Sequence, residues 1–125
     1  MKTHNFLKDL ELKGTTGEEL IEKIYHKIYS RLLLDSRINF FFQGKDVDKI
    51  ESMHRLLMAS ILNPDIQYDG PTLRKAHENL ALNDSHFDIV AEHLLTVLGE
   101  FSVPDYIIEI IKVKVLPTRN DVLNR

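Results

Sequence analysis

The feature that most restricts how this chain can fold is the spacing of its apolar residues, which recur every three or four positions. That spacing places side chains on one face of an α-helix, whereas a half-buried strand needs alternation every second residue. The clearest case lies between positions 17 and 35, where the regular apolar positions are Leu20, Ile21, Ile24, Tyr25, Ile28 and Leu32. We therefore expect an all-α fold.

The same spacing, read together with residues that start and stop helices, predicts the order of the helices. We expect a short leading helix that ends in a turn at residues 14–17, long helices over 17–35 and 47–62, and a helix of about two turns that Gly70 and Pro71 open. A helix then starts at Asn83 or Asp84, and a last one runs from Asp105 to about Leu123 with an interruption at Pro117. The apolar residues expected to face inward on that last helix are Tyr106, Ile107, Ile110, Ile111, Val113 and Leu116.

Composition excludes several classes of protein. The chain has 125 residues, a net charge of -3 and scattered basic residues, which disfavours nucleic-acid binding and suits one domain. It contains no cysteine, which excludes disulfides, iron–sulfur clusters and thiolate zinc sites. No apolar run approaches the ~18 residues of a membrane span, so we expect a cytoplasmic protein that does not bind membranes.

Histidines are the residues that can carry metal chemistry in this chain. His77 and His54 lie on the apolar faces of two predicted helices, although a buried histidine is more often a hydrogen-bonded core residue. His77 and Glu78 begin like a helical zinc-protease motif, but Ala81 stands where the second ligand is needed. The serines lack a nucleophile turn, and no phosphate-binding glycine loop exists. The histidines expected to be solvated are His4, His26 and His93.

Two inward histidines, Tyr29 and an aromatic turn before Gly44 together suit a haem. Haem requires a neutral imidazole nitrogen for the iron and an apolar slot for the macrocycle. The turn contains Phe41 and Phe42, which either plug a helix corner or form a flat wall for a planar ligand. The competing interpretation is a haem-free helical module that binds a protein partner, with both histidines in its core.

The stretch from Tyr68-x-Gly70 through Lys75-Ala76-His77, with His86-Phe87-Asp88 after it, resembles the proximal region of the truncated haemoglobins. The helix of Tyr29, followed by Asp35 and Phe41-Phe42-x-Gly44, is similar to the distal half of that family. The chain is most similar to group I, because Val90 stands where the other groups carry a tryptophan. The resemblance implies a two-over-two helical sandwich around a haem, in one domain over residues 1–125, with residues 1–16 a variable leading segment.

Carried over residue by residue, the resemblance implies that His77 is the proximal iron ligand and that Phe42 packs on the haem face. It implies that Tyr29 points its hydroxyl at the iron-bound ligand. His54 falls where the family usually has a glutamine, and it either donates a hydrogen bond to the ligand or itself binds the iron. Further contacts with the cofactor are implied for Ile50, Leu57, Met58, Leu73 and Val90, and for Arg74 or Lys75, which either pairs with a haem propionate or is a solvated surface charge.

The implied function is binding of O2, and also of NO and CO, in a haem protein that works with an unidentified reductase as a monomer or weak dimer. Hydrogen bonding to bound O2 favours slow release, which suits scavenging or sensing better than oxygen transport. Nitric oxide dioxygenation or peroxidase-like turnover is the enzymatic alternative. The chain departs from the family at Thr16-Gly17 and Asn63-Pro64, which replace glycine pairs. Thr118 appears where some cyanobacterial relatives attach haem through a histidine, so we expect non-covalent haem b.

Overall fold

The computed structural model describes residues 4–11, 15–78 and 80–125, and within these ranges it consists of helices and turns without a β-strand. The prediction of an all-α fold is therefore confirmed. The elements are α1 (Phe6–Asp9), α2 (Gly17–Leu34), the 3-10 helix η1 (Asn39–Phe42), α3 (Val47–Leu62), α4 (Leu73–His77), α5 (Asp84–Glu100), α6 (Asp105–Val115), the 3-10 helix η2 (Leu116–Thr118) and α7 (Arg119–Leu123).

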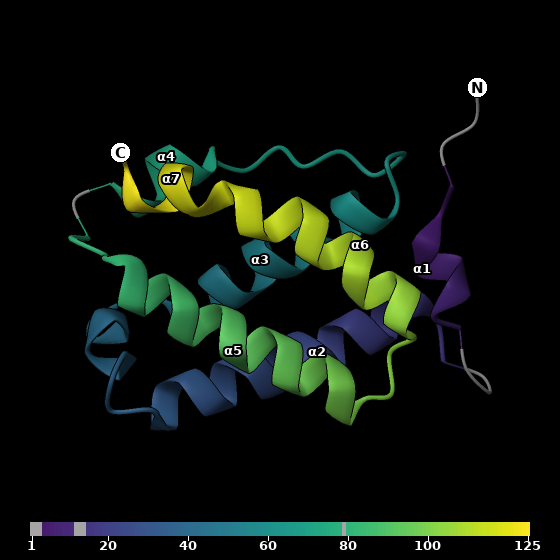
Figure 1. Ribbon diagram of the computed structural model, residues 1–125, viewed down its shortest axis with the longest axis horizontal. Helices are drawn as coiled ribbons and strands as arrows, with labels where there is room; N and C mark the ends of the chain where they lie inside the picture. Colours follow the sequence, from purple (N-terminus) through teal and green to yellow (C-terminus); the bar gives the residue numbers. More distant parts are fainter. Residues whose placement is uncertain (1–3, 12–14, 79) are drawn as a thin grey trace.

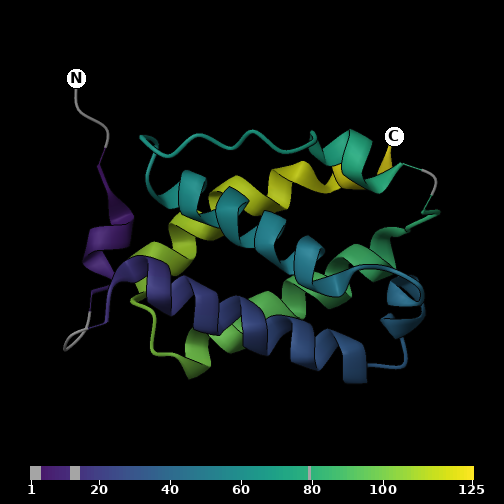
Figure 2. The same cartoon turned by 180° about the vertical axis from the view of Figure 1, so that it is seen from behind.

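The longer helices form two pairs that lie one over the other. Figure 1 shows α5 and α6 in front of α2 and α3, and Figure 2 shows the same arrangement from behind. Helix α2 is central, because it packs against both α3 and α5. This is the two-over-two sandwich that the resemblance implied, and none of the helices in the described ranges is both long and apolar enough to cross a membrane.

Polar side chains fix where the long helices begin. The Thr16 hydroxyl oxygen accepts a hydrogen bond from the backbone N–H of Glu19 at 3.1 Å, and this satisfies a donor that the first turn leaves free. Of the two predicted starts of α5, Asn83 is the cap: its side chain and that of His86 each bond the other's backbone N–H. The predicted starts of α2 and α5 are therefore confirmed.

The start of α2 lies unusually close to α1. Gly17, predicted to end the turn at 14–17 and to start the helix over 17–35, is the first residue of α2. A Cβ atom there would overlap the carbonyl oxygen of Leu7 and lie 2.7 Å from its carbonyl carbon. Leu7 of α1 and Leu10, the residue that follows this helix, are buried against the core. Only glycine fits at this crossing. Residue 14, the first of the predicted turn at 14–17, lies outside the described ranges.

The last predicted helix has a narrower buried face than its sequence suggested. Ile107 and Ile111, one turn apart, are fully buried, but Tyr106, Val113 and Leu116 are exposed by 52%, 67% and 43%. The inward assignment of these three was wrong, because α6 covers the core with one stripe and leaves its other sides to solvent. The predicted interruption at Pro117 is confirmed, since η2 separates α6 from α7.

Candidate functional site

His77 is the last residue of α4, which is shorter than predicted. Thr72 caps the helix and accepts from the N–H of Lys75 at 3.2 Å, while Glu78 already has extended backbone angles. The Nδ1–H of His77 donates to the carbonyl oxygen of Leu73 at 2.7 Å. That bond orients the ring and leaves Nε2 as the nitrogen with a free lone pair.

His54, on α3, faces His77 across the space between the two helices. Their ring centroids lie 6.3 Å apart and the ring planes differ by 19°. Nδ1 of His54 shares a hydrogen bond with the Tyr29 hydroxyl of α2. Each imidazole therefore uses Nδ1 for a bond to the protein, and neither Nε2 bonds to any residue in the described ranges.

The surroundings keep His54 and Tyr29 neutral. Burial, followed by the proximity of His77, lowers the pKa of His54 from 6.5 to about 4. Burial, with smaller contributions from Tyr25 and Glu51, raises the pKa of Tyr29 well above its usual value. At neutral pH a neutral imidazole thus meets a protonated phenol, and a neutral imidazole nitrogen is what a metal ion requires.

The apolar residues predicted to line the haem site are buried or half-buried. The ring of Phe42 lies 5.8 Å from the ring of Tyr29 at an interplanar angle of 77°. Phe41 and Phe42 are half-buried, whereas Phe40 is 49% exposed, so two of the three phenylalanines face inward. Met58 is fully buried in the core, and the other predicted lining residues are half-buried, namely Ile50, Leu57, Leu73 and Val90.

The side chains of α3 and α4 around His54 and His77 fit a flat apolar cofactor. Helix α3 buries Met58, Ala59 and Leu62, whereas its apolar stripe of Ile50, Met53, Leu57 and Ile61 is only half-buried, and α4 has no buried residue. Apolar surface therefore remains available on both sides of the space between the histidines. Two imidazoles that share one metal ion have centroids about 6 Å apart when each metal–nitrogen bond is about 2 Å, which matches the observed separation. The donor set and the apolar walls suit a haem.

The two cations beside His77 have protein partners. The guanidinium of Arg74 donates to a carboxylate oxygen of Asp121 at 2.9 Å and to the carbonyl oxygen of Arg125 at 2.7 Å. Lys75 pairs with Glu78 at 2.8 Å. Both side chains are exposed, and the structure provides each with an ion pair.

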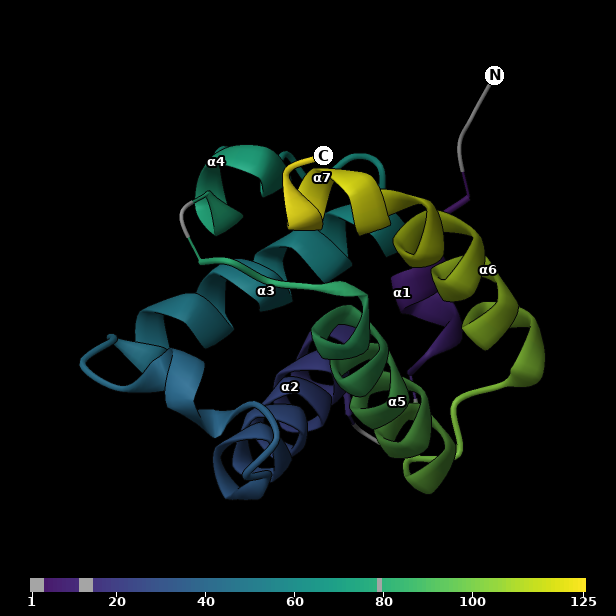
Figure 3. The same ribbon diagram turned by 60° about the vertical axis from the view of Figure 1, so that its left-hand side comes forward.

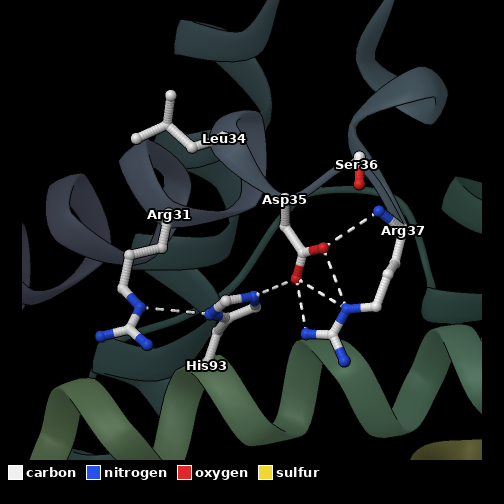
Figure 4. Close-up of a pocket in the computed structure, with 6 residues that line it drawn as sticks. All are labelled: Arg31, Leu34, Asp35, Ser36, Arg37 and His93. Carbon is white, nitrogen blue, oxygen red and sulfur yellow. Dashed lines mark hydrogen bonds and ion pairs between the residues drawn. The ribbon is translucent and has the colours of Figure 1, made fainter.

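His93 does not lie at the surface as predicted. It is only 7% exposed, donates from Nε2 to Asp35 at 2.8 Å, and accepts at Nδ1 from Arg31 at 3.2 Å (Figure 4). Arg37, and then His93, hold the pKa of the Asp35 carboxyl well below its usual range. These bonds join the end of α2 to α5, and the sequence does not reveal them because the partners lie 58 positions apart.

Two further residues beside the site were not assigned a role from the sequence. Tyr25, one turn before Tyr29, has its ring 6.5 Å from that of His54. His86 caps α5 and meets the ring of Phe41 edge-on at 4.7 Å. The four-residue spacing of the two tyrosines on one apolar face was a signal for the first; the second depends on a tertiary contact.

Two pairs of helices lie one over the other, and His54 on α3 faces His77 on α4. This arrangement fits a haem-binding domain of the globin class. The sequence profile of the bacterial-like globins matches residues 14–124. A group 1 truncated hemoglobin of Synechocystis sp. is 39% identical over 121 aligned residues, which cover 92% of this chain and 95% of the relative. The chain belongs to the bacterial-like globin family, as a group 1 truncated hemoglobin, and this family binds haem and diatomic gases.

Solved structures agree with this assignment. The 2/2 hemoglobin from Synechococcus sp. PCC 7002, in the cyanomet state with covalently attached heme, superposes with a TM-score of 0.81 at 33% identity and covers 87% of this chain and 94% of that one. The truncated hemoglobin of Tetrahymena pyriformis in its Fe(III) form gives 0.76 at 27% identity, over 82% and 88% of the two chains.

Proposed function

We propose that this protein binds O2, and also NO and CO, at the iron of a non-covalent haem b held by His77. The observation that supports this most is the pair of facing imidazoles of His54 and His77, in which both Nδ1 atoms are bonded to the protein and neither Nε2 atom bonds to a residue that the structure describes. The haem supplies the iron that binds the gas, and the residues of this chain decide how the two sides of that iron differ.

His77 serves as the proximal ligand in this proposal. Its hydrogen bond to the Leu73 carbonyl holds the imidazole in one orientation and makes Nε2 more basic. The apolar contacts expected for the macrocycle come from side chains that still have exposed surface in the structure, namely Phe42, Ile50, Leu57, Leu73 and Val90.

The hydrogen bond between Tyr29 and His54 can run in either direction, with the phenol or the imidazole as the donor. When the Tyr29 O–H donates to Nδ1 of His54, Nε2 carries a hydrogen that is available to an iron-bound ligand. When Nδ1–H donates instead to the Tyr29 oxygen, Nε2 has a free lone pair and the phenol hydrogen points elsewhere. We assign the first arrangement to the gas-bound protein and the second to a gas-free state in which His54 binds the iron.

Non-covalent attachment is supported by Thr118, which lies in η2 and donates its hydroxyl hydrogen to the carbonyl of Val115 at 2.6 Å. A threonine offers no imidazole nitrogen to bond a haem vinyl group. Mass spectrometry of the denatured, haem-loaded protein should therefore give the mass of the polypeptide alone. A mass increased by one haem would contradict this part of the proposal.

The test of the function is haem titration of wild-type protein and of a His77→Ala variant, with His26→Ala as a control at an exposed position. We expect a sharp Soret band for the wild type and the control, and a weak, shifted one for His77→Ala. In the reduced, gas-free state the wild type should show sharp, split visible bands, and His54→Leu one broad band. An unchanged Soret band and unchanged uptake in His77→Ala would contradict the assignment of His77 as the proximal ligand. A wild-type protein that takes up no haem would favour the haem-free helical module.

A further inference from the structure

Helix α4 carries His77 but has little packing of its own to hold it in place. It has five residues, fewer than an isolated helix needs to be stable, and none of its side chains is fully buried. The core cluster of buried residues contains no member of α4. The position of His77 must therefore depend on contacts with neighbouring elements.

The neighbour that contacts α4 most closely is α7. Figures 1 and 3 show the two short helices side by side at one end of the molecule. Arg74, one turn before His77, donates from Nε to Asp121 at 2.9 Å and from an Nη to the carbonyl oxygen of Arg125 at 2.7 Å. One planar guanidinium thus binds two acceptors at the end of α7 in a fixed geometry.

Helix α7 is in turn fixed to the start of α5. Arg119 donates to Asp84 at 3.0 Å and to Asp88 at 2.6 Å, and its guanidinium lies 4.5 Å from the centroid of the buried Phe87 ring. Arg125 donates to both carboxylate oxygens of Asp84, at 2.8 and 2.9 Å. A continuous series of contacts runs from the core through α5 and α7 to α4.

We propose that the Arg74–Asp121 contact is a latch that positions the proximal histidine, so that Arg74 acts through α4 on His77. This inference rests on the proposed role of His77 as the iron ligand. In this proposal the binding partner of Arg74 is α7 and not a haem propionate. Because exposed ion pairs add little to global stability, the latch should control the local placement of α4 more than the unfolding of the whole chain.

The test compares Arg74→Gln, Asp121→Asn and the double variant, each loaded with haem, with Lys112→Gln as a control that loses an ion pair to Glu109 on α6. Transfer of haem to an excess of a haem-scavenging apoprotein measures the dissociation rate. We expect each single variant to release haem roughly five-fold faster, the factor that corresponds to about 1 kcal/mol. The double variant should release haem no faster than the single variants, because both substitutions break the same contact between Arg74 and Asp121.

A second readout is hydrogen exchange at the Ala76 amide, whose N–H donates to Thr72 within α4 at 2.9 Å. It should exchange faster in the latch variants, with the urea midpoint unchanged. Repeating the haem-loss measurement with haem dimethyl ester separates the latch from a propionate contact, because the ester carries no carboxylate. A latch keeps the five-fold effect with the ester, whereas a propionate contact loses it.

Three results would overturn the latch: haem loss from Arg74→Gln at the control rate, an Asp121→Asn variant that behaves like wild type, or an effect that disappears with the ester. The His77→Ala titration keeps the two proposals apart. If His77→Ala loses haem while Arg74→Gln releases haem at the control rate, only the latch proposal fails. If His77→Ala binds haem as the wild type does, the proposed function fails, whatever Arg74 does.

Discussion

Replacing Gly17 by alanine separates two opposing effects on the stability of this protein. Helix propensity alone predicts a gain, because glycine in a helix costs about 0.5–1 kcal/mol relative to alanine. The structure predicts a loss, since the new Cβ would overlap the Leu7 carbonyl, which belongs to the backbone of α1 and cannot rotate away. The alanine variant can form only if α1 moves.

The size of the loss follows from what α1 buries. Leu7 and Leu10 are 4% and 2% exposed, and burying a leucine side chain contributes roughly 1.5–3 kcal/mol. Complete displacement of α1 would thus cost about 3–6 kcal/mol, and a partial shift would cost less. After the gain in helix propensity is subtracted, we expect Gly17→Ala to lower the free energy of unfolding by about 1–4 kcal/mol.

Urea unfolding followed by circular dichroism, at one fixed haem occupancy, measures this difference. The matched control is Gly99→Ala in α5, where an added Cβ meets no atom within 4 Å and propensity alone should raise stability. We expect the two alanine variants to shift the urea midpoint in opposite directions. A Gly17→Ala variant as stable as the wild type, or more stable, would refute the steric reasoning.

Two further predictions concern the Tyr29–His54 pair and the Asp35–His93 pair. Tyr29→Phe removes the O–H that donates to Nδ1 of His54 in the gas-bound arrangement, so the tautomer that points the His54 Nε2–H at bound O2 is no longer favoured. It should speed O2 dissociation about 10-fold in stopped-flow measurements, the effect of losing one intramolecular hydrogen bond worth about 1.4 kcal/mol. Tyr25→Phe, one turn earlier on α2, should change the rate little, and equal rates for the two variants would contradict the role of Tyr29. Asp35 has a pKa below its usual value, so its contribution to stability is complete above the unfolded-state value of about 3.9 and is lost as the pH falls below it. Asp35→Asn should therefore lose less stability than the wild type between about pH 4 and pH 2 in acid-unfolding experiments, and parallel curves would count against a stabilising pairing of Asp35 with Arg37 and His93.

Local signals in the sequence were enough to predict most helices. Apolar spacing, with Thr16 at one end of α2 and Asn63-Pro64 after α3, predicted those two helices to within a residue. These signals act through hydrogen bonds and sterics over one or two turns, so they do not depend on the rest of the fold. The boundaries of α4 were less accurate, because the helix ends at His77 where the sequence offers no glycine.

Contacts between distant residues were the part that the sequence could not supply. That His54 and His77 each face inward follows from periodicity, but that they face each other depends on how α3 and α4 are placed. Arg74 reads as an exposed charge beside His77, and its partner lies 47 positions later. His93 was assigned to solvent because Asp35, which makes its burial tolerable, lies on another helix.

The half-buried apolar stripe of α3 has a consequence for how this protein can diverge. Helix α3 contributes Met58, Ala59 and Leu62 to the core that α2 and α5 dominate, whereas Ile50, Leu57 and their neighbours on the stripe keep exposed surface. A substitution in the core changes its packed volume and costs stability unless the neighbouring side chains repack. A substitution on the α3 stripe mainly changes the shape and polarity of the surface available to a ligand. The chain can therefore explore new ligand preferences at positions where folding imposes little selection.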